Sequence, residues 1–123
     1  MALGNIMTLK RLDASLDNEG IDLVSISGLS EAFARLEQER FDVVMIDSLI
    51  EEVGYACRNI YKLACVPIVL LFREREANWQ KLNSLEVDGF VPVESGKYEF
   101  ASRIKAISRR GIMVTSAQPG RYL

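Results

Sequence analysis

The stretch FDVVMIDSLIEE, residues 41–52, decides the fold, because a run of apolar residues ends at an aspartate. Residues 41–47 are nearly continuous in apolar character, which is typical of a strand buried on both faces of a parallel sheet. The run VPIVLLF at 66–72 has the same character, and shorter apolar runs lie at 21–27 and 89–93. Asp47 therefore stands at the carboxyl end of a predicted buried strand.

Segments with helical spacing separate these runs. Each brings apolar side chains to one face and charges to the other, over residues 30–40, 51–64, 74–86 and 97–110. Gly111 follows the last segment, where a glycine commonly ends a helix. Short alternation of strand and helix predicts an α/β fold with a doubly wound parallel sheet.

The N-terminal segment fits two patterns. NIMTLK, residues 5–10, has the character of a strand that precedes a short helix, whereas the apolar spacing over 5–19 fits one continuous helix. The first strand is normally central in this architecture, and its loss would split the sheet. We therefore favour the strand followed by the short helix, with the single helix as the alternative.

Composition limits the possible functions. The chain has 123 residues, about half of them apolar, and a formal charge of −2, which fits one domain without overall attraction to nucleic acid or anionic membrane. No apolar run is long enough for a membrane helix and no signal-peptide pattern is present, so we expect a cytoplasmic protein. The chain has no histidine, which excludes histidine-based triads, and no paired acid and base indicates an enzyme. Cys57 and Cys65 are expected to be reduced thiols.

From FDVVMID onward the sequence resembles a response-regulator receiver domain (CheY-like), the module of two-component signal transduction that accepts a phosphoryl group on an aspartate after its third strand. The stretch LEVDGFVPVESGKYEFASRIKAISRR, residues 85–110, is close to the fifth strand and fifth helix of the OmpR/PhoB subfamily. The resemblance covers about residues 20–110. It implies a flavodoxin-like sheet of five parallel strands in the order 2-1-3-4-5, with helices on both faces.

The family's functional positions can be carried over one at a time. Asp47 falls on the phosphoacceptor position, and Phe72 falls where the family has a threonine or serine. Phe90 matches the aromatic switch position. Val93 falls on the position of a lysine that pairs with the phosphoryl group, and Glu94 replaces the following proline. The resemblance therefore implies a degenerate site around a retained aspartate.

The family's magnesium-binding acidic pair is missing in either register of the N-terminus. The strand interpretation puts Lys10 and Arg11 there, and the single-helix interpretation puts the pair near Leu3 and Gly4. Magnesium needs hard oxygen ligands, and phosphoryl transfer needs cations to neutralise developing charge. We therefore expect ordinary receiver chemistry to fail, with no metal or cofactor bound. Lys10 or Arg11 beside Asp47 would act as an internal counter-charge that holds one conformation.

The same resemblance implies a homodimer through the fourth helix, fifth strand and fifth helix. In the OmpR/PhoB subfamily charge pairs link the two subunits across this face. The matching residues here are Lys81, Asp88, Glu99 and Arg103, with Asp88 and Arg103 as an expected pair between subunits. Charges that are only solvated are the alternative interpretation of the same residues.

These inferences predict an atypical receiver, or pseudo-receiver, that acts in signal transduction and transcription regulation as a phosphorylation-independent dimerisation and regulatory module. DNA would be bound only through an output domain absent from this chain. The alternatives are a phosphorylatable receiver whose nonstandard metal site uses Asp47 with Glu51 or Glu52, and a flavodoxin-like domain that binds a small ligand. A strand-ending carboxylate that caps the next turn is the purely structural interpretation of Asp47.

The receiver-like domain is expected to span residues 1–110, with 111–123 as a C-terminal tail or linker. The tail contains IMVTS, residues 112–116, which has strand-like character. A frayed linker and an added strand are the two interpretations of this segment.

Overall fold

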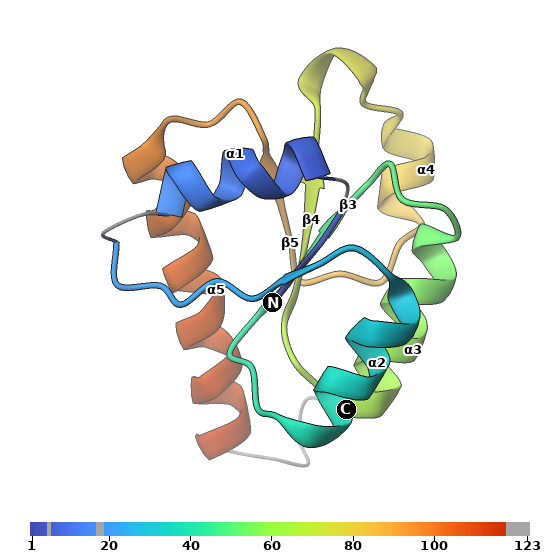
Figure 1. Ribbon diagram of the computed structural model, residues 1–123, viewed down its shortest axis with the longest axis vertical. Helices are drawn as coiled ribbons and strands as arrows, with labels where there is room; N and C mark the ends of the chain where they lie inside the picture. The colour runs from blue at the N-terminus through green and yellow to red at the C-terminus, as the bar shows by residue number, and fades with distance from the viewer. Residues whose placement is uncertain (5, 17–18, 118–123) are drawn as a thin grey trace.

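A computed structural model describes residues 1–4, 6–16 and 19–117 of the protein. Figure 1 shows a central sheet with helices on both sides. All strand pairs are parallel, and the strand order is β2-β1-β3-β4-β5, which confirms the predicted fold. The strands are β1 Ala2–Leu3, β2 Ser25–Ile26, β3 Val44–Asp47, β4 Ile68–Phe72 and β5 Gly89–Pro92.

Two hydrophobic clusters hold the helices on opposite faces of the sheet. Helices α1 and α5 cover one face, and α2, α3 and α4 cover the other (Figure 1). The helices are α1 Ile6–Leu16, α2 Leu29–Gln38, α3 Val53–Ala64, α4 Trp79–Asn83 and α5 Lys97–Ala117, and a 3-10 turn, η1, spans Glu74–Glu76.

Strand β4 shows why a continuous apolar run is needed between the two layers. All its residues are buried, and successive side chains point to opposite faces. Ile68, Leu70 and Phe72 join the cluster under α2 and α3, whereas Val69 and Leu71 join the cluster under α1 and α5. A strand with polar residues at every second position would bury them without partners.

Helix α5 packs very close to β5 at Gly89. A Cβ atom at this position would lie 2.6 Å from Cδ1 of Ile107. The absence of a side chain at Gly89 therefore lets the isoleucine fill the space over the edge strand. Ile107 and its neighbour one turn earlier, Ile104, are both buried there.

The favoured interpretation of the N-terminus was wrong. The first strand is β1 at Ala2–Leu3, and the segment predicted as a strand lies in α1, which is a single helix. Leu9, Leu12 and Leu16 are buried at helical spacing against the sheet. The apolar stripe thus decides the structure of this segment, while the central strand lies at the very start of the sequence.

Three other predicted elements differ from the structure. The run 21–27 contributes only the short β2, and the predicted helix 74–86 is divided into η1 and α4. Helix α5 continues through Gly111 to Ala117, so IMVTS is helical and the expected helix end at Gly111 was wrong. The part of the tail at 118–123 lies outside the described residues, and the domain boundary at residue 110 stays a prediction.

No helix within the described ranges is both long and apolar enough to cross a membrane.

Candidate functional site: a buried aspartate bound by an arginine

Asp47 lies at the carboxyl edge of the sheet, as the sequence predicts. It is the last residue of β3, pairs with Leu71 of β4, and is fully buried. The adjacent β1 ends at Leu3, which is also buried. The carboxylate is thus surrounded by strand ends and is not open to water.

The guanidinium group of Arg73 binds this carboxylate with both of its terminal nitrogens. Nη1 donates to Oδ1 of Asp47 at 2.8 Å, and Nη2 donates to Oδ2 at 3.2 Å. The backbone amide of Leu49 also donates to Oδ1, at 2.9 Å. Bidentate pairing between arginine and a carboxylate is among the stronger charge-assisted interactions in proteins.

The position of Arg73 follows from the parallel pairing of β3 and β4. Asp47 is in register with Leu71, so Arg73 lies just past the end of β4 and can reach across to the carboxylate. The hydrogen bonds from Arg73 to Asp47 raise the pKa of Arg73 above its usual range, with burial opposing the shift. The Arg73 side chain is 22% exposed and that of Asp47 only 1% exposed. The Arg73 side chain thus lies between the Asp47 carboxylate and the solvent.

Acidic residues surround the outer side of Arg73. Glu76 and Glu94 lie close enough to raise the pKa of the guanidinium further. The Glu94 carboxylate also accepts a hydrogen bond from the backbone amide of Glu74, at 3.2 Å. This bond connects the segment after β5 to the segment that follows Arg73.

The prediction that Lys10 or Arg11 provides the positive charge beside Asp47 was wrong, because Arg73 binds the carboxylate. Lys10 and Arg11 lie on α1 and are exposed, because the single-helix register moves them away from the end of β1. In this register the positions of the family's acidic pair are near Leu3 and Gly4, both buried. Among the described residues, no cluster of acidic, cysteine or histidine side chains has the arrangement of a metal site.

Phe72 and Phe90, which lie at predicted switch positions, form an aromatic cluster with Trp79. The rings of Phe72 and Trp79 are 5.1 Å apart between centroids, those of Trp79 and Phe90 are 5.8 Å apart, and those of Phe72 and Phe90 are 6.5 Å apart. Their tilted, edge-on geometry is favourable for aromatic pairs. Val93 is buried, and its amide donates to the carbonyl of Phe72 at 2.9 Å.

The four residues of the predicted dimer face are exposed. Arg103 pairs with Glu99 of its own helix at 2.7 Å. The Asp88 carboxylate accepts a hydrogen bond from the amide of Ile68 at 2.7 Å, which satisfies the first amide of β4. Lys81 lies on α4. Pairing of these residues between subunits stays a prediction.

Sequence reasoning did not identify Arg73, although a signal was present. An arginine directly follows the buried run 66–72, in the strand expected to neighbour the one that ends at Asp47. Parallel neighbours bring their carboxyl ends to one edge, so a charge after one strand can reach a charge that ends the next. The missing step was to compare the residues after the two predicted strands with each other.

No family model matches the sequence. The chain is 24% identical over 110 residues to the alkaline phosphatase synthesis transcriptional regulatory protein PhoP of Bacillus subtilis (strain 168), an alignment that covers 86% of this chain and 45% of that protein. The chain thus spans about half the length of this curated relative.

Several solved structures share the fold. A CheY-like receiver domain from Methanospirillum hungatei JF-1 has a TM-score of 0.75 at 15% identity and covers 90% of this chain and 93% of that one. The signal receiver domain of a Syntrophus aciditrophicus histidine kinase has a TM-score of 0.71 at 22% identity, covering 89% of both chains. The receiver domain of a Pseudomonas aeruginosa PAO1 sensor kinase, solved with a magnesium ion in its active-site cleft, has a TM-score of 0.69 at 18% identity, covering 90% and 94%.

This chain has the CheY-like fold of these solved structures, and the predicted resemblance to response-regulator receiver domains is confirmed. Its sequence is also similar to the transcriptional regulatory protein PhoP, as the resemblance to the OmpR/PhoB subfamily implies.

Proposed function

We propose that this domain is an atypical receiver that regulates without being phosphorylated, as a dimerisation module of a signal-transduction and transcription-regulation protein. The observation that carries the proposal is the bidentate bond from Arg73 to the buried Asp47. A guanidinium occupies both oxygens that a metal ion and a phosphoryl group would need.

The chemistry around Asp47 supports this function. Phosphoryl transfer to a carboxylate builds up negative charge, which requires a divalent cation and positive side chains. Leu3 and Gly4 supply no metal ligands near the aspartate, and the buried Val93 supplies no positive charge. Arg73 provides one fixed positive charge, which neutralises the carboxylate and holds both of its oxygens in hydrogen bonds.

The aromatic cluster supports a single fixed conformation. In the family, the positions of Phe72 and Phe90 take part in switching. Here both rings pack with Trp79, and Phe72 is buried. Rearranging this cluster would break several aromatic contacts, each worth about 0.5–1.5 kcal/mol beyond burial. The domain therefore presents the face formed by α4, β5 and α5 in one form.

A phosphorylation assay tests the first part of the proposal. The protein is incubated with magnesium and acetyl phosphate, and its intact mass is recorded beside that of the Asp47→Asn variant. We expect no phosphate-sized increment in the unaltered chain. An increment that is lost in Asp47→Asn would overturn the proposal and favour a nonstandard metal site that includes Glu51 or Glu52, which lie in the exposed loop after β3.

Measurement of the solution mass tests the dimer. Light scattering after size-exclusion chromatography is expected to give twice the chain mass, and Arg103→Glu is expected to give a monomer. Lys62→Glu on α3 is the matched control, since Lys62 is also an exposed basic residue but lies on another face. A monomer for the unaltered chain, or a dimer insensitive to Arg103→Glu, would contradict this interface.

The remaining parts of the proposal concern the whole protein. Similarity to a transcriptional regulator supports an output domain outside this chain that binds DNA. We also propose that the protein acts in the cytoplasm and has no enzymatic turnover of its own. Fractionation of cells that produce the tagged protein tests the location.

A further inference from the structure

The segments that follow β4 and β5 lie side by side beyond the last paired residues of the two strands. Phe72 is in register with Pro92, and the Val93 amide donates to the Phe72 carbonyl at 2.9 Å. The next residues along the two segments are Arg73 and Glu94. The parallel pairing of β4 and β5 therefore brings Glu94 beside the segment that begins with Arg73.

The Glu94 side chain connects these two segments. A turn fixes its backbone, because the Ser95 amide donates to the Pro92 carbonyl at 3.1 Å. From this turn the Glu94 carboxylate accepts a hydrogen bond from the backbone amide of Glu74 at 3.2 Å. This bond continues the connection between the two strands past the point where their backbone pairing ends.

The bond acts on the peptide unit directly after Arg73. The amide of this unit is the Glu74 amide, and its carbonyl, that of Arg73, accepts from the Glu76 amide at 3.1 Å. The peptide unit before Arg73 is bonded to Val93 through the Phe72 carbonyl. Peptide units are planar, so bonds to the units on both sides of Arg73 fix the direction in which its side chain leaves the backbone.

This direction matters because Arg73 binds with strict geometry. Both terminal nitrogens meet the two oxygens of Asp47, and such a bidentate pair requires the guanidinium plane to align with the carboxylate. A long side chain also loses rotamer freedom when it is held in one place. The Arg73 side chain is 22% exposed, so water competes for it on the outer side. A fixed backbone limits the positions that the guanidinium can take.

The charge of Glu94 acts in the same sense as its hydrogen bond. The hydrogen bonds to Asp47 raise the pKa of Arg73 most, burial opposes the shift, and the nearby carboxylates of Glu76 and Glu94 raise it further. Glu94 thus favours the charged guanidinium and also holds the backbone beside it.

We propose that Glu94 is a positioning residue, which holds Arg73 on the Asp47 carboxylate through its bond to the Glu74 amide. This inference rests on the proposed function, because it assigns what keeps the arginine at the Asp47 site. Loss of the bond frees the peptide unit after Arg73 and lets the guanidinium leave the carboxylate more often. The turn between β5 and α5 therefore controls how firmly the aspartate site is closed.

Hydrogen exchange of the Arg73 guanidinium protons, followed by nuclear magnetic resonance, tests the proposal. A guanidinium bonded to a carboxylate shields its protons from water, so their exchange rate reports how often it leaves Asp47. The signals of Arg73 are assigned by their absence from Arg73→Gln. In Glu94→Ala we expect exchange at least about fivefold faster, or roughly 1 kcal/mol, since a tenfold change equals about 1.4 kcal/mol. Unchanged exchange would overturn the proposal.

Two further variants separate the bond from a general effect of losing a glutamate. Glu94→Gln keeps an oxygen that accepts from the Glu74 amide, so its exchange rate should return most of the way to that of the unaltered chain. Glu86→Ala is the matched control, because Glu86 is also an exposed glutamate but precedes β5. Exchange in Glu94→Gln as fast as in Glu94→Ala, or equal acceleration in Glu86→Ala, would contradict the assigned role.

The Leu49 amide gives a second readout, which a change in stability alone does not move. This amide donates to the same oxygen of Asp47 as Nη1 of Arg73. When the arginine leaves, the bond to Leu49 changes, so the amide chemical shift in Glu94→Ala should move toward its value in Arg73→Gln. A folded Glu94→Ala chain with an unmoved Leu49 signal would overturn the proposal.

The outcomes of this experiment are distinct from those of the phosphorylation assay. A phosphate-sized increment in the unaltered chain would contradict the proposed function, whatever the exchange rates are. Unchanged Arg73 exchange in Glu94→Ala, without any increment in the unaltered chain, would contradict only the role of Glu94.

Discussion

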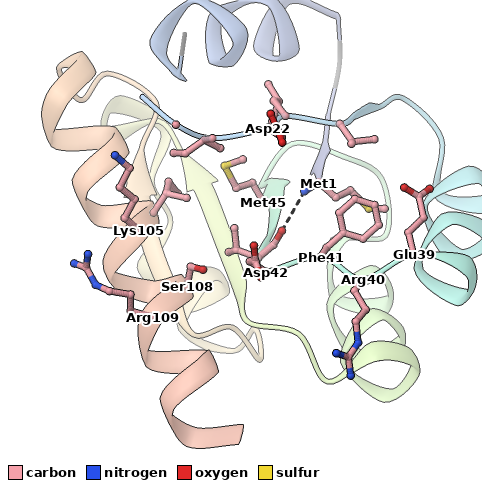
Figure 2. A pocket seen from close by; sticks show the side chains of 16 residues that line it. Met1, Asp22, Glu39, Arg40, Phe41, Asp42, Met45, Lys105, Ser108 and Arg109 are labelled. Atoms are coloured by element: carbon pink, nitrogen blue, oxygen red, sulfur yellow. Dashed lines mark hydrogen bonds between the residues drawn. The ribbon is translucent and has the colours of Figure 1, made fainter. Parts of the chain in front are cut away.

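At the carboxyl edge of the sheet, the buried Asp47 carboxylate is bound by Arg73 and by a backbone amide. At the amino edge, by contrast, a cavity lies between α5 and the segments that precede β2 and β3 (Figure 2). The aspartate at the carboxyl edge is thus enclosed by the protein's own groups, whereas a cavity lines the amino edge. A shared fold thus does not decide which groups line each edge of the sheet.

The largest expected effect concerns the closed edge. Arg73→Ala leaves the buried Asp47 without its cation, so we expect a loss of about 3 kcal/mol in the free energy of unfolding, measured by urea denaturation. The partial exposure of Arg73 puts this value at the lower end of the range for buried pairs. Arg75→Ala, at an exposed position nearby, is the control and should change stability by less than about 0.5 kcal/mol.

A double variant sharpens this interpretation. Removing both charges in Asp47→Ala/Arg73→Ala should cost less than Arg73→Ala alone, because the buried carboxylate is removed together with the charge that balances it. If the single and the double variant lose the same free energy of unfolding, the contribution of Arg73 comes from packing of its side chain and not from the ion pair.

The second effect concerns the aromatic cluster beside the closed edge. Phe72→Ala removes a buried ring in contact with Trp79 and Phe90, and about 3 kcal/mol of stability should be lost. Trp79 is the only tryptophan of the chain, so its fluorescence spectrum reports on the cluster. An unchanged spectrum would show that this cluster does not hold α4 in place.

A smaller effect is expected at the amino edge from Asp88. Its carboxylate accepts from the Ile68 amide at the start of β4, and Asp88→Ala should cost about 1 kcal/mol in chemical denaturation. Asp22→Ala is a suitable control, since Asp22 is an exposed aspartate on a loop at the same edge. If both variants have the same stability, the hydrogen bond of Asp88 makes no net contribution.

The smallest effects come from two residues with left-handed backbone conformation, one near each edge. Glu52, after β3, has φ of 56°, and Cys65, before β4, has φ of 49°. Glycine adopts this conformation without steric cost, so Glu52→Gly and Cys65→Gly should each stabilise the fold by up to about 1 kcal/mol. Thermal unfolding checks both, and a loss of stability at either position would show that its side chain makes compensating contacts.

Much of the fold could be predicted because buried elements have recognisable patterns of apolar residues in the sequence. The runs that became β3 and β4 are continuous in apolar character because these strands are covered on both faces. The N-terminus was harder, since residues 5–10 are compatible with both strand and helix spacing. Only the packing of Leu9, Leu12 and Leu16 against the sheet separates the two interpretations.

The site was predicted in part. Asp47 was placed correctly at the end of a buried strand, and the lack of acidic partners could be inferred in either register. The identity of the counter-charge was missed, because Lys10 and Arg11 depend on the register of the first strand. Arg73 lies 26 residues from Asp47 in the sequence, and its role follows from a pairing that no local pattern records.

The sequence alone determined the alternation of buried strands and amphipathic helices, and the place of Asp47 at the end of a strand, because periodicity and burial are properties of neighbouring residues. Only the tertiary structure decided that Arg73 binds the Asp47 carboxylate and that a cavity lies between α5 and the segments before β2 and β3. Both features depend on which strands pair and in what register, and that choice is made by contacts between residues far apart in the chain.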